Sequence, residues 1–291
     1  MNSSTYIQSQ KFVELFYGKG HVNGTVVNDQ VFIDDTVSNS INMKMLAIEN
    51  AEDLEGTQAD GILGLAPIPS SGADSFVKKL ADGQVIDGAS FTVYLGVLSE
   101  SSYIEFGRYK GSTENVTWIP LISTAYWMVT LDSFIYKNTD LKLKSTRAVL
   151  DTGSSIIGFP TEDLKSLIFA IKEDRQLYYL EDINFYAMKC SSVYEFTDIT
   201  VNIGGHLTLI PPKEYLLKLS DYCIFYIFDL GASVKFILLG DTYLRGNIII
   251  HDIENKRIGM FDQVAHNSPT GAATSQTILK VFVGFIFLSA L

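Results

Sequence analysis

The chain lacks the features that mark several common classes of protein. Its 291 residues contain two cysteines, which allow either one disulfide in an oxidising compartment or two buried thiols. The four histidines, at positions 21, 206, 251 and 266, show no metal-ligand spacing. Lysine and arginine number 22 against 33 acidic residues, and no basic stripe occurs that could neutralise phosphates. We therefore expect no metal and no nucleic-acid partner.

What the chain does have is apolar and aromatic residues in abundance. Hydrophobic residues make up 47% and aromatic residues 12% of the sequence, enough for a sizeable core. The length allows one large or two mid-sized domains. Many tyrosines and phenylalanines, with short runs of valine, isoleucine and threonine, favour strands over long helices. The composition therefore predicts a mostly β protein.

The N-terminal region predicts a hairpin with a glycine-rich tip. Residues 11–17 and 25–33 have the pattern of strands, and Gly18, Lys19 and Gly20 form the turn between them. A nucleotide-binding glycine turn would open a helix, whereas here the chain continues as a strand. A kinase-type glycine hairpin would be followed by H-R-D and D-F-G motifs, which the sequence does not contain. We expect an exposed loop.

The remaining pattern is also mainly one of strands. Residues 59–67 predict an apolar strand, and residues 76–80 have helical spacing. Residues 161–172 predict an amphipathic helix with Thr161 as N-cap. Hairpins are expected at 204–205 and around 254–256.

Two stretches of the chain are similar to each other. D-G-I-L-G-L-A at residues 60–66 and F-I-L-L-G-D-T-Y-L at residues 236–244 both place two branched apolar residues before a glycine. Such a repeat suggests an internal duplication of two β lobes.

The strongest chemical signal is Asp-Thr-Gly-Ser-Ser at residues 151–155. Asp151 follows an apolar strand and precedes residues whose N–H and O–H groups can donate to its carboxylate. The tripeptide is short, so an ordinary turn in which Asp151 bonds local backbone is the competing interpretation. The motifs around it decide between the two.

In the order of these motifs the chain resembles the pepsin-like aspartic proteases, from its first residues to about residue 262. The matching elements are S-S-T-Y with Y-G-K-G-H-V-N-G, A-D-G-I-L-G-L-A-P, F-T-V-Y-L-G, W-I-P-L with Y-W-M-V-T-L-D-S, A-V-L-D-T-G-S-S-I-I-G-F-P, the two cysteines, and I-L-L-G-D-T-Y-L-R-G-N-I-I-I-H-D-I-E-N-K-R-I-G-M-F. Seven elements in the right order make the resemblance specific. It implies a mostly β, two-lobed acid protease fold.

The resemblance implies a role for each residue of these motifs. Asp151 would be the catalytic aspartate of the C-terminal lobe, and Thr152 would hold the two active-site loops together. Substrate would be contacted by Gly153 and Ser154 in the cleft and by Tyr17, Gly18 and Lys19 in the flap. Leu238, Leu239 and Gly240 would cross behind the D-T-G loop, and Cys190 and Cys223 would form the C-lobe disulfide.

The implied activity is that of an aspartic-type endopeptidase. Two aspartates share a proton and a water: one takes a proton from the water, and the other gives one to the scissile carbonyl. Aspartic proteases are the standard example of two close carboxylates that cannot both ionise, so such a pair works best in acid. No metal or organic cofactor is needed. We expect peptide or protein substrates and a monomer.

The sequence departs from the family in having one D-T-G-type loop where two are needed. Asp151 precedes Gly240 by 240 − 151 = 89 positions, and the same spacing before Gly64 gives 64 − 89 = −25, roughly 25 residues before Met1. We therefore expect a truncated sequence whose N-terminal lobe is incomplete. Two alternatives stay open. One is a one-aspartate homologue that binds peptides or acts as a decoy. The other is a retroviral-type dimer, which conflicts with the presence of most of two lobes.

On this basis the chain divides into three parts. Residues 1–118 form a partial N-terminal lobe with the flap hairpin, residues 119–262 a C-terminal lobe, and residues 263–291 a polar linker with an apolar tail. The last eleven residues are too few to cross a bilayer. After the small residues Ser268, Gly271, Ala272 and Ala273 they fit a GPI-attachment signal, with a tail anchor and a tail packed on the protein as alternatives.

Localisation is indicated by weaker signals. N-x-[ST] sequons at Asn2, Asn23 and Asn115 are candidates for glycosylation. The polar residues after Met1 do not form a signal peptide, so either the chain is cytosolic or its beginning is missing. With the family resemblance, we expect the secretory pathway, ending at the cell surface, in a vacuole or lysosome, or outside the cell.

The role of two further features, an aromatic pair and a loop lysine, has two interpretations each. Tyr126 and Trp127 line the primed side of the cleft or pack in the core. Lys19 favours acidic peptides or is an ordinary solvated loop lysine.

Overall fold

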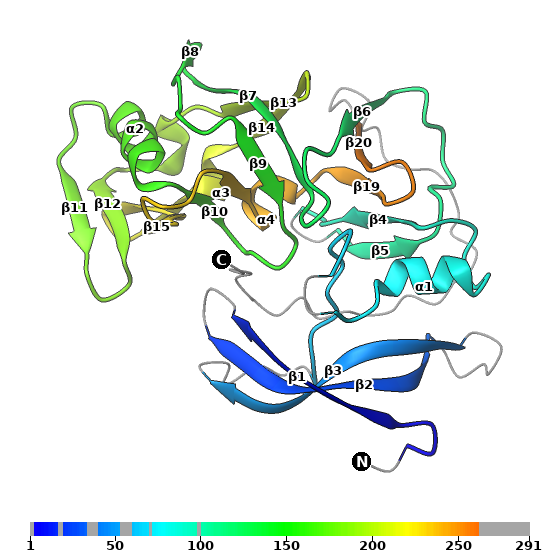
Figure 1. Ribbon diagram of the computed structural model, residues 1–291. Coiled ribbons are helices and arrows are strands. Elements are labelled where there is room, and N and C mark those ends of the chain that lie inside the picture. The colour runs from blue at the N-terminus through cyan, green and yellow to red at the C-terminus, as the bar shows by residue number, and fades with distance from the viewer. Residues whose placement is uncertain are drawn as a thin grey trace.

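The computed structural model describes residues 3–16, 20–33, 40–52, 60–69, 72–97 and 100–261, which fold into four β-sheets and a few short helices (Figure 1). This confirms the predicted mostly β fold. Within these ranges, no helix is long and apolar enough to cross a membrane.

The strands in chain order are β1 (Ile7–Phe16), β2 (His21–Phe32), β3 (Ser40–Glu52), β4 (Ser90–Tyr94), β5 (Tyr103–Phe106), β6 (Val116–Pro120), β7 (Met128–Tyr136), β8 (Thr139–Asp140), β9 (Arg147–Leu150), β10 (Ile157–Phe159), β11 (Leu177–Leu180), β12 (Phe185–Lys189), β13 (Ile199–Ile203), β14 (His206–Ile210), β15 (Leu216–Leu219), β16 (Tyr222–Phe225), β17 (Ile227–Asp229), β18 (Ile237–Leu239), β19 (Ile248–Asp252) and β20 (Arg257–Phe261). The helices are α1 (Phe76–Asp82), α2 (Thr161–Lys172), α3 (Pro212–Tyr215), α4 (Asp241–Leu244) and the 3-10 turn η2 (Val193–Glu195).

The first three strands form an antiparallel sheet of their own at the foot of Figure 1. Pairing of β1 with β2 continues up to Phe16 opposite His21, which confirms the predicted hairpin. Its tip, with Tyr17, Gly18 and Lys19, lies outside the described residues. The edge strand β1 is largely exposed: the side chains of Phe12 and Phe16 are 60% and 55% accessible to solvent.

A second sheet joins distant parts of the chain. Its order is β5-β4-β19-β20-β6, so strands from residues 90–120 pair with the last two strands. The predicted hairpin around 254–256 is confirmed by the β19–β20 pairing. The lobe boundary predicted at 118/119 falls within β6, and this sheet takes strands from both sides of it. The boundary itself stays a prediction.

The largest sheet carries the D-T-G loop. It runs β14-β13-β7-β9-β18-β10-β17, with β8 added to β7. The hairpin predicted at residues 204–205 is the β13–β14 turn. Buried leucines and isoleucines from β9, β10, β18 and α2 form the core on one side of the sheet.

Two local predictions need correction. Residues 61–66 form no strand in the structure, because their apolar side chains have no sheet to join, as described below. The N-cap of α2 is Pro160, and Thr161 is already its first helical residue. The Thr161 hydroxyl donates to Asp229 at 2.8 Å, since a tertiary carboxylate is within its reach. The helix and its buried apolar side are confirmed, as is α1.

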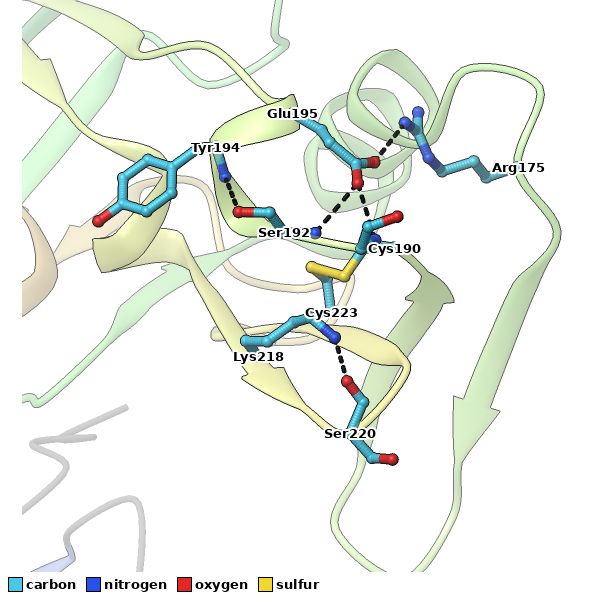
Figure 2. Close-up of a disulfide and its surroundings, with 9 residues drawn as sticks. Arg175, Cys190, Ser192, Tyr194, Glu195, Lys218, Ser220 and Cys223 are labelled. Atoms are coloured by element: carbon cyan, nitrogen blue, oxygen red, sulfur yellow. Dashed lines mark hydrogen bonds and ion pairs between the residues drawn. A yellow bond between two sulfur atoms is a disulfide. The ribbon is translucent and has the colours of Figure 1, made fainter.

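A fourth sheet, in the order β11-β12-β16-β15, holds the disulfide (Figure 2). Cys190 and Cys223 are bonded, as the family resemblance implied, and Cys223 is fully buried. Beside them Glu195 accepts hydrogen bonds from the backbone N–H groups of Ser191 and Ser192 and pairs with Arg175 at 3.1 Å. The disulfide thus ties the end of β12 to β16.

Candidate active site

Asp151 stands directly after β9, in the middle of the largest sheet. β9 runs parallel to β18, with Leu150 opposite Leu239, and the Asp151 N–H continues the ladder by donating to the Leu239 carbonyl at 3.0 Å. The strand is apolar because it is covered by the core on one side, and the chain turns at Asp151 where the sheet ends. The residue is only 9% exposed.

Both oxygens of the Asp151 carboxylate receive a hydrogen bond from its own loop. The Gly153 N–H donates to Oδ1 at 2.9 Å, and the Ser154 hydroxyl donates to Oδ2 at 3.1 Å. Burial raises the pKa of Asp151 above its ordinary value, and these two donors oppose the rise by favouring the charged form. The result is a carboxyl group held at both oxygens, with its pKa above the ordinary value.

The segment after β18 crosses closely behind this loop. The Asp241 N–H donates to the Ser154 carbonyl at 2.8 Å, and the Thr242 hydroxyl donates to the Ser155 carbonyl at 3.2 Å. A Cβ atom on Gly240 would come within 2.3 Å of the Ser154 carbonyl oxygen. Only glycine fits at this crossing. Gly240 thus packs on the D-T-G loop, directly after Leu238 and Leu239 of β18, and the role of these three residues in supporting an active-site loop stays a prediction.

The other predicted residues are placed less completely. Gly153 and Ser154 lie in the loop beside the carboxylate, as described. Thr152 is partly exposed, and within the described part of the chain its hydroxyl has no hydrogen-bond partner, so its role between two loops stays a prediction. Residues 17–19 cannot be placed relative to Asp151.

Asp241 is a second carboxylate near the D-T-G loop, partly buried, which the sequence motifs did not indicate. Burial raises its pKa to about 6, the Arg245 guanidinium opposes the rise, and the negative charge of Asp151 adds to it. Its Oδ1 atom is buried with no hydrogen-bond partner among the described residues. The available signal was its position directly after the glycine of the L-L-G-D motif.

An apolar row lies on the side of the sheet that faces away from the main core. The row crosses four strands at Met128, Val149, Leu238 and Gly158, and continues to Phe228. Met128, Val149 and Leu238 are 5% to 8% exposed, so the row is a small buried cluster beside the D-T-G loop.

The adjacent aromatic residues Tyr126 and Trp127 pack in different places. Tyr126 packs, partly buried, against the apolar row, whereas Trp127 turns into the main core and is 6% exposed. The Trp127 indole N–H donates to the Leu65 carbonyl at 2.8 Å. Core packing is therefore the outcome for Trp127, and it also fastens segment 60–66 to the C-terminal part of the chain.

The two similar stretches of sequence have opposite environments. Leu238 and Leu239 are 5% and 0% exposed, whereas Ile62 and Leu63 in the matching positions are 38% and 36% exposed. Gly240 lies pressed against the D-T-G loop, but a Cβ on Gly64 would meet no described atom within 4 Å. Segment 60–66 thus has the sequence of a loop-crossing segment, but among the described residues no loop packs on it.

The described residues contain no group of three or more histidine, cysteine, aspartate or glutamate side chains that could hold a metal ion.

Similarity to known proteins shows the family to which this chain belongs. The chain matches the family described as eukaryotic aspartyl protease over residues 1–263. It belongs to that family. It is 26% identical over 264 residues to embryonic pepsinogen of Gallus gallus, covering 89% of this chain and 67% of the relative. It is 30% identical over 272 residues to the probable vacuolar protease A of Trichophyton verrucosum (strain HKI 0517), covering 89% and 66%.

A solved structure of an aspartic proteinase has the same fold. The aspartic proteinase from Irpex lacteus superposes with a TM-score of 0.74 at 19% identity, covering 90% of this chain and 84% of that one. The pepsin-like fold expected from the motifs is thereby confirmed, and the relatives support an aspartic protease at the level of the family.

Proposed function

We propose that the protein hydrolyses peptide bonds as an aspartic-type endopeptidase, with Asp151 as one of two catalytic carboxylates. The observation that carries the proposal is the Asp151 carboxylate, held by Gly153 and Ser154 in a loop that Gly240 clamps from behind. Its raised pKa suits a group that must be protonated in one step and ionised in the next.

The second carboxylate would come from a D-[ST]-G loop outside these 291 residues, which contain one such motif. Segment 60–66 is the docking position for it, because Ile62, Leu63 and Gly64 repeat the clamp sequence but lie uncovered. A docked loop would bury the two apolar side chains, worth about 1 to 2 kcal/mol each. Water between the two aspartates would then attack the scissile carbonyl.

The direct test compares two proteins at acid pH with a peptide substrate. We expect the 291 residues alone to show no pepstatin-sensitive hydrolysis, since one carboxylate cannot act as base and acid together. A protein that also carries a D-T-G segment placed before residue 1 should hydrolyse the peptide, and Asp151→Asn in that protein should abolish activity. Robust pepstatin-sensitive cleavage by the 291 residues alone would refute the two-carboxylate requirement.

A second candidate function is a one-aspartate homologue that binds peptides without cleaving them. The single D-T-G motif favours it. Sequencing of the transcript's 5′ end separates the two: an in-frame D-T-G or D-S-G roughly 25 codons upstream supports the protease. An in-frame stop codon there, with peptide binding measured by calorimetry, supports the binding protein.

The location that suits this function is the secretory pathway, with a vacuole, the cell surface or the outside as destination. The disulfide supports it, since such bonds persist in oxidising compartments. The residues of the predicted GPI-attachment signal lie outside the described ranges, so GPI attachment stays a prediction. Release of the protein from membranes by phosphatidylinositol-specific phospholipase C is the experiment for it, and no release would remove the GPI interpretation.

A further inference from the structure

His251 is a histidine in the core of the molecule that the proposed chemistry does not use. It lies on β19, directly opposite Phe91 of β4 and Ile258 of β20, and is 2% exposed. A histidine side chain gains a positive charge in acid, and a charge is costly in an apolar interior unless it is paired. The surroundings of His251 therefore influence how the protein tolerates acid.

The imidazole ring of His251 packs against two aromatic rings. It stacks on Phe91 with ring centroids 4.4 Å apart and an interplanar angle of 2°. Trp127 lies nearly perpendicular to it, with centroids 4.7 Å apart. Both aromatic side chains are buried. The face of an aromatic ring attracts a cation, but this attraction is small beside the loss of water around a buried charge.

The hydrogen bonds available to the ring suit its neutral form. A charged imidazole donates from both nitrogens, whereas a neutral one donates from one. Within the described ranges, the Nδ1 atom of His251 is buried and has no hydrogen-bond partner. A hydrogen bond with the backbone of Ile249 favours the protonated form, but burial is the larger cause and lowers the pKa of His251 to about 3.

No charged side chain of the described residues compensates for this burial. The elements packed on the ring present Phe91, Trp127 and Ile258, none of which titrates in acid. The neighbouring Asp252 points to the opposite face of β19, because successive side chains of a strand alternate. Its carboxylate is engaged there with Arg257 at 2.9 Å. A proton added to His251 would therefore create an unpaired charge in the core.

We propose that His251 is an acid-sensitive element of the core, which must stay neutral in the folded protein and therefore favours unfolding as the solution becomes acidic. In the unfolded chain the ring meets water and takes up a proton at its ordinary pKa of 6.5. The folded state excludes that proton down to about pH 3. The stability that depends on the neutral ring is thus fully present above about pH 6.5 and is lost as the pH falls toward 3.

The position of His251 gives this effect a structural consequence. The ring joins β19 to β4 through Phe91, and Trp127 connects it to segment 60–66 by donating to the Leu65 carbonyl at 2.8 Å. Charging the ring would therefore loosen a junction between distant parts of the chain. For a protease of the proposed kind, a mildly acidic compartment suits this residue better than a strongly acidic one. Only that last conclusion rests on the proposed function.

Urea denaturation of the full chain at pH 6 and pH 4, with the disulfide intact, tests the proposal without any assay of activity. His251→Phe and His251→Leu replace the ring with side chains that cannot titrate. The unfolding constant of the parent, divided by that of either variant, should rise roughly tenfold per pH unit, or about 100-fold between the two pH values. Other titrating groups act on parent and variant alike, and a general loss of packing in a variant cancels between the two pH values.

The matched control is Ile258→Val. This residue lies opposite His251 on β20 and is fully buried, so the substitution removes core contacts without changing a titratable group. The ratio of unfolding constants between the parent and this variant should be the same at pH 6 and pH 4.

Proton NMR of the folded parent provides an independent measurement. The ring C–H signals of His251, assigned by their absence from His251→Phe, should keep the position of a neutral imidazole from pH 7 to pH 4.5. Signals that move to the charged position above pH 5 while the protein stays folded would overturn the proposal. It is also overturned if both His251 variants keep the same ratio to the parent at pH 6 and pH 4, or if Ile258→Val changes its ratio as much as they do.

Discussion

Asp151 and Asp241 lie close enough for the charge of one carboxylate to raise the pKa of the other. The two are connected through the D-T-G loop, because the Asp241 N–H bonds the Ser154 carbonyl while the Ser154 hydroxyl bonds Asp151. The Arg245 guanidinium opposes the rise in the pKa of Asp241, and it also pairs with Glu214 at 3.4 Å.

This relationship predicts a loss of stability as the pH rises. The pKa of Asp241 is about 6 in the folded protein against an ordinary value of 3.8, so the folded state favours the protonated form. The stability that depends on it is fully present below about pH 4 and is lost as the pH rises through 6. Asp241→Asn should therefore raise the free energy of unfolding at pH 7.5 by about 2 kcal/mol and change it little at pH 3.5.

Urea denaturation at the two pH values measures this. The matched control is Asp221→Asn, which removes an exposed carboxylate from the same half of the chain and should leave the pH dependence as it is. An equal effect of Asp241→Asn at both pH values would contradict the assignment.

The two glycines of the repeated segment should respond differently to the same substitution. Gly240→Ala forces a Cβ to within 2.3 Å of the Ser154 carbonyl oxygen and 2.4 Å of that of Ile156. Neither backbone atom can move freely, so we expect a loss of about 3 kcal/mol or more in stability. Gly64→Ala in the 291-residue chain should cost less than about 0.5 kcal/mol. Thermal unfolding of both variants provides the comparison.

The Gly64→Ala substitution also tests whether a second loop docks on segment 60–66. If a second D-[ST]-G loop packs on segment 60–66, Gly64→Ala should become costly once that loop is supplied. A Gly64→Ala variant that remains as stable and active as the parent in the extended protein would argue against this docking.

The disulfide should contribute strongly to stability. Cys190 and Cys223 close a loop across 33 positions, which corresponds to about 3 to 4 kcal/mol of unfolded-state entropy. The double change to serine should lower the unfolding midpoint, and a reducing agent should lower the midpoint of the parent alone. If reduction shifts both proteins equally, the effect does not come from this bond.

Of the two sequons within the described residues, the structure favours Asn115 as the glycosylated one. Asn115 lies in an exposed turn. Asn23, in contrast, lies within β2 and accepts a hydrogen bond from Asn50 at 2.9 Å, while the hydroxyl of its sequon partner Thr25 is buried and donates to Glu49 at 2.6 Å. In a eukaryotic secretory host, Asn115→Gln should abolish the mobility shift on endoglycosidase treatment, and Asn23→Gln should leave it. The reverse pattern would refute the assignment.

Several properties followed from the order of residues alone. Motifs such as A-V-L-D-T-G-S-S and I-L-L-G-D-T-Y-L are short, local and ordered along the chain, so they indicated the family, the mostly β fold and Asp151 without any coordinates. The sequence also predicted the hairpins and the buried side of α2. Alternation with period 2 and helical spacing of apolar residues depend only on the local geometry of a strand or helix. The disulfide needed the resemblance in addition, since two cysteines by themselves fit a free pair as well.

The tertiary structure decided what depends on packing partners. Segment 60–66 has the pattern of a buried strand, but a strand forms only where a sheet can accept it, and here Ile62 and Leu63 remain exposed. Trp127 and Tyr126 are neighbours in the turn just before β7, yet Trp127 packs in the main core and Tyr126 packs against the apolar row. The pKa values of Asp241 and His251 likewise depend on which surfaces the fold brings together, and no local pattern carries that information.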